Sequence, residues 1–280
     1  MLLRRFFAKQ ILQAHQIPLP VVTTLHGTDI TLVGKEETFK TVIKYAIEQS
    51  DLVTSVSGYL KQATYDFFHV QKDIEVIPNF VSLERFRPQP EIRNLYRKLI
   101  APNNEKILIH ISNFRKVKRV HDVLKIYLEV KQHIPAKLIM VGDGPERTNL
   151  EKFVRENQLT NCVIFMGKQE KVEDILAISD VFLMPSESES FGLAALEAMA
   201  CGIPVVASNT GGLKEIIHHD FNGFMAEVGN IKQMSEYVLN ILNEEKYSFY
   251  SINALKTAQN FDENIIAKTY EKFYSQIFKK

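Results

Sequence analysis

The sequence predicts an α/β protein with two parallel-sheet domains, of which the first is incomplete. From Glu105 onward, short apolar runs alternate regularly with amphipathic segments, whereas the earlier residues repeat this alternation only a few times. Strands and helices that alternate in this way form a parallel sheet with helices on both faces. We therefore expect one complete Rossmann-like domain, preceded by part of another.

The complete domain is expected at residues 89–260. Its expected strands are the apolar runs Lys106–Ile111, Lys137–Val141, Cys162–Phe165, Val181–Met184 and Val205–Ala207. Its expected helices are the amphipathic segments Val120–Gln132, Glu146–Asn157, Val172–Ile178, Ala194–Ala200 and Leu213–His218. An alternation of this length is sufficient for a doubly wound sheet.

The incomplete domain is expected at residues 1–88. It offers strands at Pro20–Leu25, Leu52–Val56 and Ile74–Ile77 and a helix at Glu37–Gln49, while residues 1–16 resemble a late helix of such a domain. About two or three strands are too few for an independent doubly wound domain, so roughly a hundred residues of it are expected to be absent. A fragment and a domain completed by a second chain both fit this pattern. A homo-oligomer is a separate possibility that the sequence leaves open.

Prolines mark the boundary between the two domains. Pro78-Asn79-Phe80 is a turn, and Arg87-Pro88-Gln89-Pro90 has the composition of a linker. Beyond the second domain, residues 261–280 contain an expected amphipathic helix at Glu263–Phe278. We expect its apolar face to pack back on the first domain.

Composition limits the classes of partner and compartment. The net charge is +1, from 34 basic and 33 acidic residues, so no overall field attracts nucleic acid. Cys162 and Cys201 lie outside any metal-ligand spacing, which fits a reducing cytoplasm. The start of the chain lacks the pattern of a signal peptide, and no uninterrupted apolar run is long enough to span a membrane.

The segment Pro185–Ala200 carries the strongest signal for a binding site. Glu189 lies in a loop after an apolar strand, and Glu197 lies within the following helix. At the helix start, backbone N–H groups near Ser190, Phe191, Gly192 and Leu193 form a site for a phosphate or diphosphate. A solvated loop followed by an ordinary acidic helix residue explains the two carboxylates equally well on spacing alone.

This segment, continued by Ala198–Val206, resembles glycosyltransferase family 4. Val141–Glu146, Val163–Gly167 and Gly211–Ile217 occur in the family's order, and the resemblance covers nearly the whole chain. It implies a GT-B fold and a retaining transferase that uses a nucleotide-sugar donor. Complete members begin with a strand and a glycine-rich turn, which this sequence does not supply.

Two strings, Thr23–Thr31 and Ile111–Arg119, resemble one branch of the family. That branch implies transfer of N-acetylglucosamine from UDP-N-acetylglucosamine to a small hydroxy acid, L-malate, in bacillithiol formation. Two alternatives stay open: another family 4 hexosyltransferase with a different sugar or acceptor, and a nucleotide-sugar-binding fragment without transferase activity.

The resemblance also implies roles for the charged residues. Arg115 and Lys118 would hold the diphosphate, on which negative charge develops in the reaction. Glu189 would accept hydrogen bonds from sugar hydroxyls and Glu197 from ribose hydroxyls. The alternative for the cations is a solvated basic turn in which Lys116 and Arg119 are their equals.

Four further positions follow from the resemblance. Met166 and Gly167 would lie beside the uracil ring, although Met166 could instead fill the core. His26 would face the donor sugar, although a His in a Gly-Thr-Asp turn can be structural. Asn79 would contact acceptor or donor, although a turn explains it nearly as well.

No metal and no cofactor is expected. The adjacent His218 and His219 point in different directions on a helix and lack carboxylate partners. An NAD-dependent oxidoreductase would need a full glycine fingerprint, and the turn at Gly142–Pro145 lacks its third glycine because Arg147 occupies that position.

Overall fold

The computed structural model describes residues 20–27, 30 and 37–279 of the 280-residue chain. The chain divides into two compact units, of which unit 1 comprises Met1–Phe80 and Glu263–Lys280 and unit 2 comprises Val81–Asp262. At the edge of unit 2 its first and last segments pair, since the Val81 N–H donates to the Phe261 carbonyl at 2.9 Å. The expected boundaries were 88/89 and 260/261. The expected helix in residues 1–16 lies outside the described residues.

Unit 1 contains a three-stranded parallel sheet in the order β1-β2-β3. Its strands are β1 (Val22–Leu25), β2 (Leu52–Ser55) and β3 (Glu75–Val76). Among its described residues, helices include α3 (Glu37–Glu48), α4 (Gly58–Phe68), α12 (Glu263–Tyr274) and the short 3₁₀ helix η4 (Ser275–Lys279). The C-terminal helix is thus grouped with the first part of the chain, far from it in sequence.

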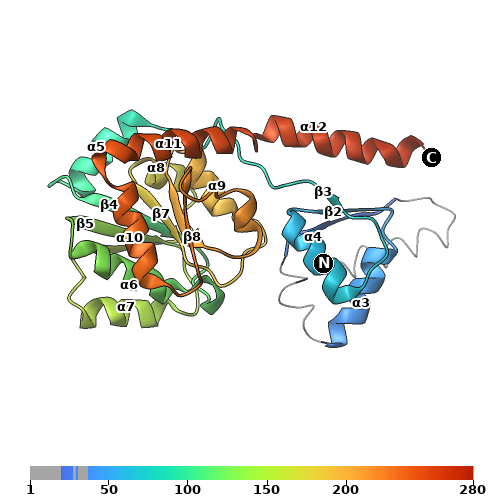
Figure 1. The fold of residues 1–280 in the computed structure, drawn as a ribbon, viewed down its shortest axis with the longest axis horizontal. Coiled ribbons are helices and arrows are strands. Elements are labelled where there is room, and N and C mark those ends of the chain that lie inside the picture. Colours follow the sequence, from blue (N-terminus) through green and yellow to red (C-terminus); the bar gives the residue numbers. More distant parts are fainter. Residues whose placement is uncertain (1–19, 28–29, 31–36, 280) are drawn as a thin grey trace. The chain divides into compact units, whose positions relative to one another are not determined.

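Unit 2 contains a six-stranded parallel sheet in the order β6-β5-β4-β7-β8-β9 (Figure 1). Its strands are β4 (Lys106–Ile111), β5 (Ala136–Val141), β6 (Val163–Gly167), β7 (Val181–Met184), β8 (Val205–Ser208) and β9 (Gly223–Ala226). The chain runs outward from β4 to one edge and then returns to β7, which is the doubly wound order of a Rossmann domain. The strand order therefore reverses between β4 and β7.

The helices of unit 2 include four that connect successive strands and three that lie at its ends. They are α5 (Pro90–Ile100), α6 (Val120–Lys131), α7 (Arg147–Glu156), α8 (Val172–Ala177), α9 (Leu193–Ala200), α10 (Ile231–Ile241) and α11 (Glu244–Gln259), with 3₁₀ turns η2 (Lys116–Lys118) and η3 (Gly211–Glu215). Every residue of β7 and β8 is buried, as expected for strands that are covered on both faces.

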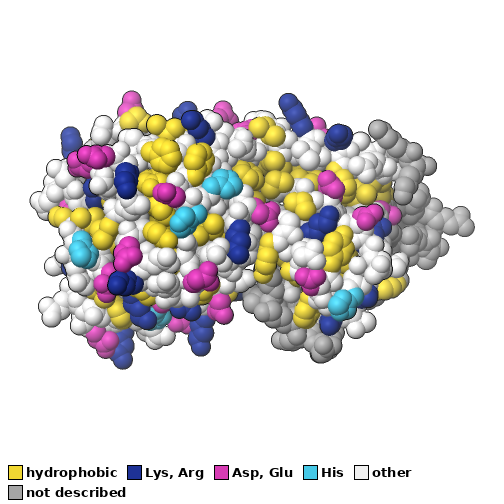
Figure 2. Space-filling model, viewed as in Figure 1, with side chains coloured by type: hydrophobic (Ala, Val, Ile, Leu, Met, Phe, Trp, Pro, Cys, Tyr) yellow, Lys and Arg dark blue, Asp and Glu magenta, His cyan; other side chains and the backbone are white. Residues whose placement is uncertain are grey.

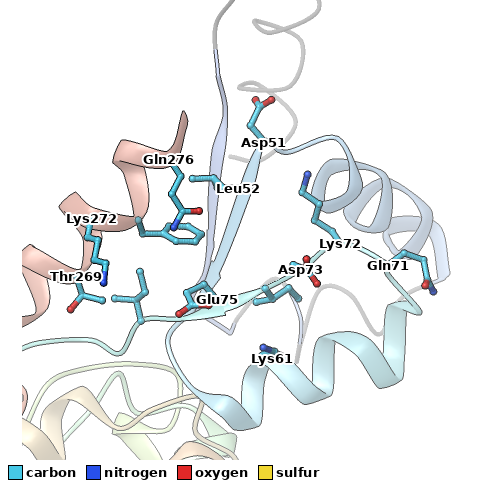
Figure 3. A pocket seen from close by; sticks show the side chains of 13 residues that line it. Asp51, Leu52, Lys61, Gln71, Lys72, Asp73, Glu75, Thr269, Lys272 and Gln276 are labelled. Carbon is cyan, nitrogen blue, oxygen red and sulfur yellow. The ribbon is translucent and has the colours of Figure 1, made fainter. Parts of the chain in front are cut away.

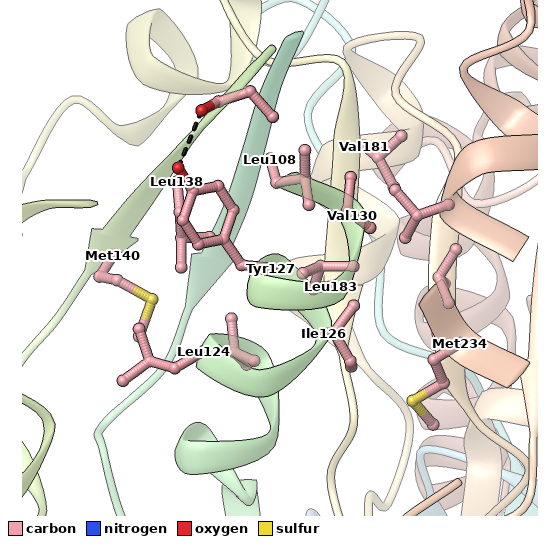
Figure 4. Close-up of a cluster of buried hydrophobic side chains, with 14 of the residues drawn as sticks. Leu108, Leu124, Ile126, Tyr127, Val130, Leu138, Met140, Val181, Leu183 and Met234 are labelled. Carbon is pink, nitrogen blue, oxygen red and sulfur yellow. Dashed lines mark hydrogen bonds between the residues drawn. The ribbon is translucent and has the colours of Figure 1, made fainter. Parts of the chain in front are cut away.

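One hydrophobic cluster holds the sheet of unit 2 against the helices on one of its faces. Figure 4 shows side chains of α6, β4, β5 and β7 meeting in it. Tyr127 is fully buried, and its hydroxyl donates to the Ala136 carbonyl at 2.8 Å. Because this bond satisfies the phenol, the large aromatic ring can lie in the core without an unpaired polar atom.

Several elements were not predicted. Neither α5 nor the segment β9–α10–α11 was expected, and the predicted segment Leu213–His218 is the 3₁₀ turn η3. Helix α5 contains no buried residue, although Ile92, Leu95, Tyr96 and Leu99 recur at helical spacing, so a signal for this helix was present in the sequence. After η3, the Asn222 side chain accepts a hydrogen bond from the His218 N–H and donates one to the Ile216 carbonyl. These two bonds form a turn in place of further helical hydrogen bonds.

The surface shows no strong charge asymmetry on the face drawn in Figure 2, where basic and acidic side chains are interspersed. This agrees with the net charge of +1. Within the described part of the chain, no helix is both long and apolar enough to cross a bilayer.

Candidate active site

The candidate site lies where the strand order of unit 2 reverses. In an open parallel sheet, the loops after the two strands at this point diverge to opposite faces and leave a crevice at the carboxyl ends. Lys118, after β4, donates from Nζ to Oε1 of Glu189, after β7, at 2.7 Å. The Glu187 N–H also donates to the Val117 carbonyl at 2.8 Å. The fold therefore brings together two predicted site residues that are 71 positions apart.

The Glu189 carboxylate is held in a defined orientation. Glu189 is only 9% exposed, and the Ser186 hydroxyl donates to its Oε1 at 2.7 Å. Both bonds to the carboxylate reach Oε1, and no described residue donates to Oε2. The second oxygen is thus available to accept a hydrogen bond from a ligand.

The glycine pair after β8 supports the backbone of Glu189. The Gly212 N–H donates to the Glu189 carbonyl at 2.9 Å. Gly211 has φ of +56°, and a Cβ there would lie 2.0 Å from the same carbonyl oxygen. This close approach requires glycine at position 211.

The start of α9 presents backbone rather than side chains. Gly192 has a left-handed conformation with φ of +99°, and α9 begins at Leu193. Phe191 is buried and packs edge-on against Phe261, with ring centroids 5.8 Å apart. Ser190 is half-buried. Phe191 and Gly192 can therefore offer a ligand only their peptide groups.

Glu197 lies one turn further along α9 and is poorly solvated. Burial raises the pKa of its carboxyl to about 7, while the positive charge of Arg85 lowers this pKa and the negative charge of Glu173 raises it. No described residue forms a hydrogen bond to the Glu197 carboxylate. A half-buried carboxyl without internal partners is an unfavourable arrangement for stability and a favourable one for binding hydroxyl groups.

The four cations after β4 are not equivalent. Arg119 is paired with Asp122 at 2.5 Å, and Lys118 is paired with Glu189. Arg115 and Lys116 are exposed to solvent. The structure therefore separates Lys118 from its neighbours and leaves Arg115 free to reach an anion at the rim.

His110, in β4, and Ser112, directly after β4, were not among the predicted site residues. His110 is fully buried. Its Nδ1 lies 2.8 Å from the carbonyl of Leu183 in β7, and its Nε2 lies 2.7 Å from the Ser112 hydroxyl. Burial lowers the pKa of His110 to about 4, so the ring is neutral. Since a carbonyl only accepts, Nδ1 donates to it and Nε2 accepts from Ser112. The sequence feature that could have revealed His110 is a polar residue within the otherwise apolar run Ile107–Ile111.

Met166 and Gly167 end β6. Met166 is half-buried, and the Gln169 side-chain amide donates to its carbonyl at 2.6 Å. Gly167 has φ of +65°, and a Cβ added there would meet no atom within 4 Å. The Gly167 carbonyl accepts from the Gly142 N–H at 2.7 Å. Met166 is therefore not a core residue, and open space lies beside Gly167.

His26 and Asn79 belong to unit 1, so the structure of unit 2 does not address their predicted roles. His26 is exposed after β1, and Asn79 is half-buried after β3. Unit 1 also contains a wide hollow of ≈ 820 Å³ between α4, β3 and α12, lined among others by Lys61, Glu75 and Lys272 (Figure 3). None of the predicted site residues lines it.

Metal ligands do not gather in the described part of the chain. Within residues 20–27, 30 and 37–279, no group of three or more His, Cys, Asp or Glu side chains could hold an ion. Cys162 and Cys201 are both free thiols.

Comparison with known families identifies the chain. The family model described as glycosyl transferases group 1 matches residues 91–266, and that of glycosyltransferase family 4 matches residues 5–85. The chain belongs to the group 1 and family 4 glycosyltransferases. It is thus a member of a family of hexosyltransferase enzymes.

Individual relatives of this glycosyltransferase differ in their donors. N-acetyl-alpha-D-glucosaminyl L-malate synthase of Bacillus anthracis is 39% identical over 271 residues, which are 97% of this chain and 68% of that protein. A GDP-mannose-dependent alpha-(1-6)-phosphatidylinositol monomannoside mannosyltransferase of Mycobacterium tuberculosis is 26% identical over 213 residues, which are 72% of this chain and 55% of that protein.

A solved structure extends the likeness to the fold. Anabaena HepE in complex with UDP and glucose has a TM-score of 0.85 and 25% identity, covering 98% of this chain and 75% of that one. The glycosyltransferase therefore has the GT-B fold, with Rossmann-like domains, as predicted. It spans about two thirds or less of the length of these two curated relatives.

Proposed function

We propose that this glycosyltransferase transfers N-acetylglucosamine from UDP-N-acetylglucosamine to L-malate with retention of anomeric configuration, a step of bacillithiol formation. The choice of donor and acceptor is supported by 39% identity to the Bacillus anthracis synthase over 97% of the chain. The transfer chemistry is supported chiefly by the pair of Lys118 and Glu189 at the carboxyl ends of β4 and β7.

The charged groups of unit 2 fit a departing diphosphate. As the glycosidic bond breaks, negative charge builds on the leaving group, and Arg115, Lys118 and the first peptide groups of α9 offset it. Donor binding would draw the Lys118 ammonium from Glu189 toward the phosphates. Glu189 would then accept from a sugar hydroxyl.

The remaining residues would orient the substrates. Glu197 would accept from the ribose hydroxyls, and peptide groups at Met166 and Gly167 would contact uracil. His26 would bond the donor sugar near the reacting carbon, and Asn79 would contact acceptor or donor. A diphosphate oxygen on the departing face would take the proton of the acceptor hydroxyl, so that this scheme needs no metal, no cofactor and no protein base.

Two alternatives are retained. The first is another family 4 hexosyltransferase, because relatives at lower identity use other donors. The second is a nucleotide-sugar-binding fragment, since the chain covers only 68% of the malate synthase. The two free cysteines support the further proposal of a reducing, cytoplasmic setting.

Release of UDP from UDP-N-acetylglucosamine, measured with and without L-malate, tests the proposal. We expect release that depends on malate and that falls by about a hundredfold or more in Glu189→Gln, because the amide cannot accept as a carboxylate does. A matched control is Glu187→Gln, since Glu187 lies in the same loop but is exposed.

Each of the other outcomes has a definite meaning. Malate-independent release stimulated by another hydroxy compound would support a different acceptor. Binding of UDP-N-acetylglucosamine without any release would support the fragment and contradict the transferase.

A further inference from the structure

Arg85 belongs to none of the motifs found in the sequence, but its side chain bonds to the connection between β6 and α8, which is part of the candidate site. Its Nη2 donates to Glu173 Oε2 at 2.9 Å and to the Glu170 carbonyl at 2.7 Å. Glu170 lies in the connection from β6 to α8, and Glu173 lies in the first turn of α8. That connection begins directly after Met166 and Gly167, which are proposed to contact the base.

The segment that carries Arg85 also packs along α9. A Cβ on Gly202, just beyond the last residue of α9, would lie 3.7 Å from Cγ of Pro88. Arg85 is therefore anchored to the β6–α8 connection, in a segment whose Pro88 lies near the end of the helix that bears Glu197.

We propose that Arg85 is a positioning residue of the ribose site, which fixes the β6–α8 connection and holds a positive charge beside Glu197. This inference rests on the proposed function, because it assigns a task to the same carboxylate. A carboxylate must be ionised to accept hydrogen bonds from both vicinal ribose hydroxyls, and a nearby guanidinium favours that state.

The charges around Glu197 support this assignment. Burial raises the pKa of Glu197, Arg85 opposes that rise, and Glu173 adds to it. Burial and, to a smaller extent, the Glu197 charge raise the pKa of Cys201 to about 12, so this thiol stays neutral. Arg85 and Glu173 are thus the charged groups that act on Glu197, and they act in opposite directions.

Calorimetric titration of UDP-N-acetylglucosamine between about pH 5.5 and 8.5 tests the proposal. The proteins are wild type, Arg85→Gln, Arg85→Lys and Glu173→Gln, each checked for an unchanged thermal unfolding midpoint. The donor's diphosphate does not titrate in this range. Histidine titrations are common to all four proteins, so differences between them report on Glu197.

We expect wild-type affinity to fall as the pH drops through about 7, where Glu197 becomes protonated. In Arg85→Gln this fall should move to higher pH, with affinity at neutral pH about two- to fivefold weaker, while Arg85→Lys restores it. In Glu173→Gln the fall should move to lower pH.

Superimposable profiles of wild type and Arg85→Gln would overturn the role of Arg85 and leave the proposed function standing. The same would follow if Arg85→Gln and Glu173→Gln shifted the profile in the same direction. If wild type did not bind the donor at any pH, the proposed function would fall together with this inference.

Discussion

At the scale of single residues, backbone conformation decides where the functional carboxylate lies. Gly211 and Gly167 both have left-handed conformations, with φ of +56° and +65°. The two positions differ in the space for a side chain. A Cβ on Gly211 would lie 2.0 Å from the Glu189 carbonyl oxygen, whereas a Cβ on Gly167 would meet no atom within 4 Å. Alanine substitutions at the two positions therefore distinguish the free-energy cost of a strained backbone from that of a steric clash.

Gly211→Ala should destabilise the protein by about 3 kcal/mol, because strain and overlap with the Glu189 carbonyl add together. Gly167→Ala should cost only about 1 kcal/mol, from the left-handed conformation alone. Urea unfolding of both variants measures the difference. Equal losses would show that the loop around Glu189 relaxes freely and that Gly211 does not hold it.

At the scale of elements, α5 is attached to the sheet by charge rather than by apolar burial. Asp180 is 3% exposed; its Oδ2 accepts from Arg97 at 2.9 Å and from the Ile107 N–H at 2.7 Å. Arg93 pairs with the other oxygen of Asp180. One buried carboxylate thus joins α5 to the amino ends of β4 and β7, opposite the candidate site.

Asp180→Asn should lower the free energy of unfolding by about 3 kcal/mol, because it leaves two guanidinium groups without their buried counter-charge. The matched control is Glu156→Gln, which removes an exposed ion pair with Lys152 at 3.7 Å and should cost less than about 0.5 kcal/mol. Chemical denaturation measures both. A small loss for Asp180→Asn would indicate that packing, not charge, holds α5.

At the scale of the whole molecule, the donor residues are concentrated in one unit. Unit 2 has its own six-stranded sheet and its own hydrophobic cluster, and it carries all the predicted site residues except His26 and Asn79. Such a unit contains what an independent domain needs.

A fragment of residues 81–262 should therefore fold and bind UDP within about threefold of the whole chain's affinity, but release no UDP from UDP-N-acetylglucosamine. Circular dichroism and calorimetry measure folding and binding. If the whole chain bound UDP more than about tenfold tighter than the fragment, unit 1 would contribute to nucleotide binding and this prediction would be wrong.

The sequence alone determined the alternation of strands and helices in residues 105–207, because apolar runs and amphipathic periods are local properties of the chain. It also predicted the segment from Glu189 to Glu197, since a strand, a polar loop and a helix start are contiguous there. It did not reveal how α5 is attached, because that depends on Asp180, a residue more than 80 positions away.

Only the tertiary structure decided which predicted residues meet. The strand order places β4 beside β7, and this brings Lys118 to Glu189 while Arg119 turns to Asp122. It also brought Arg85 to the β6–α8 connection, and the His110 side chain of β4 to the Leu183 carbonyl of β7. Such contacts join residues distant in sequence, so no local pattern encodes them; they arise when the sheet folds and its buried groups find partners.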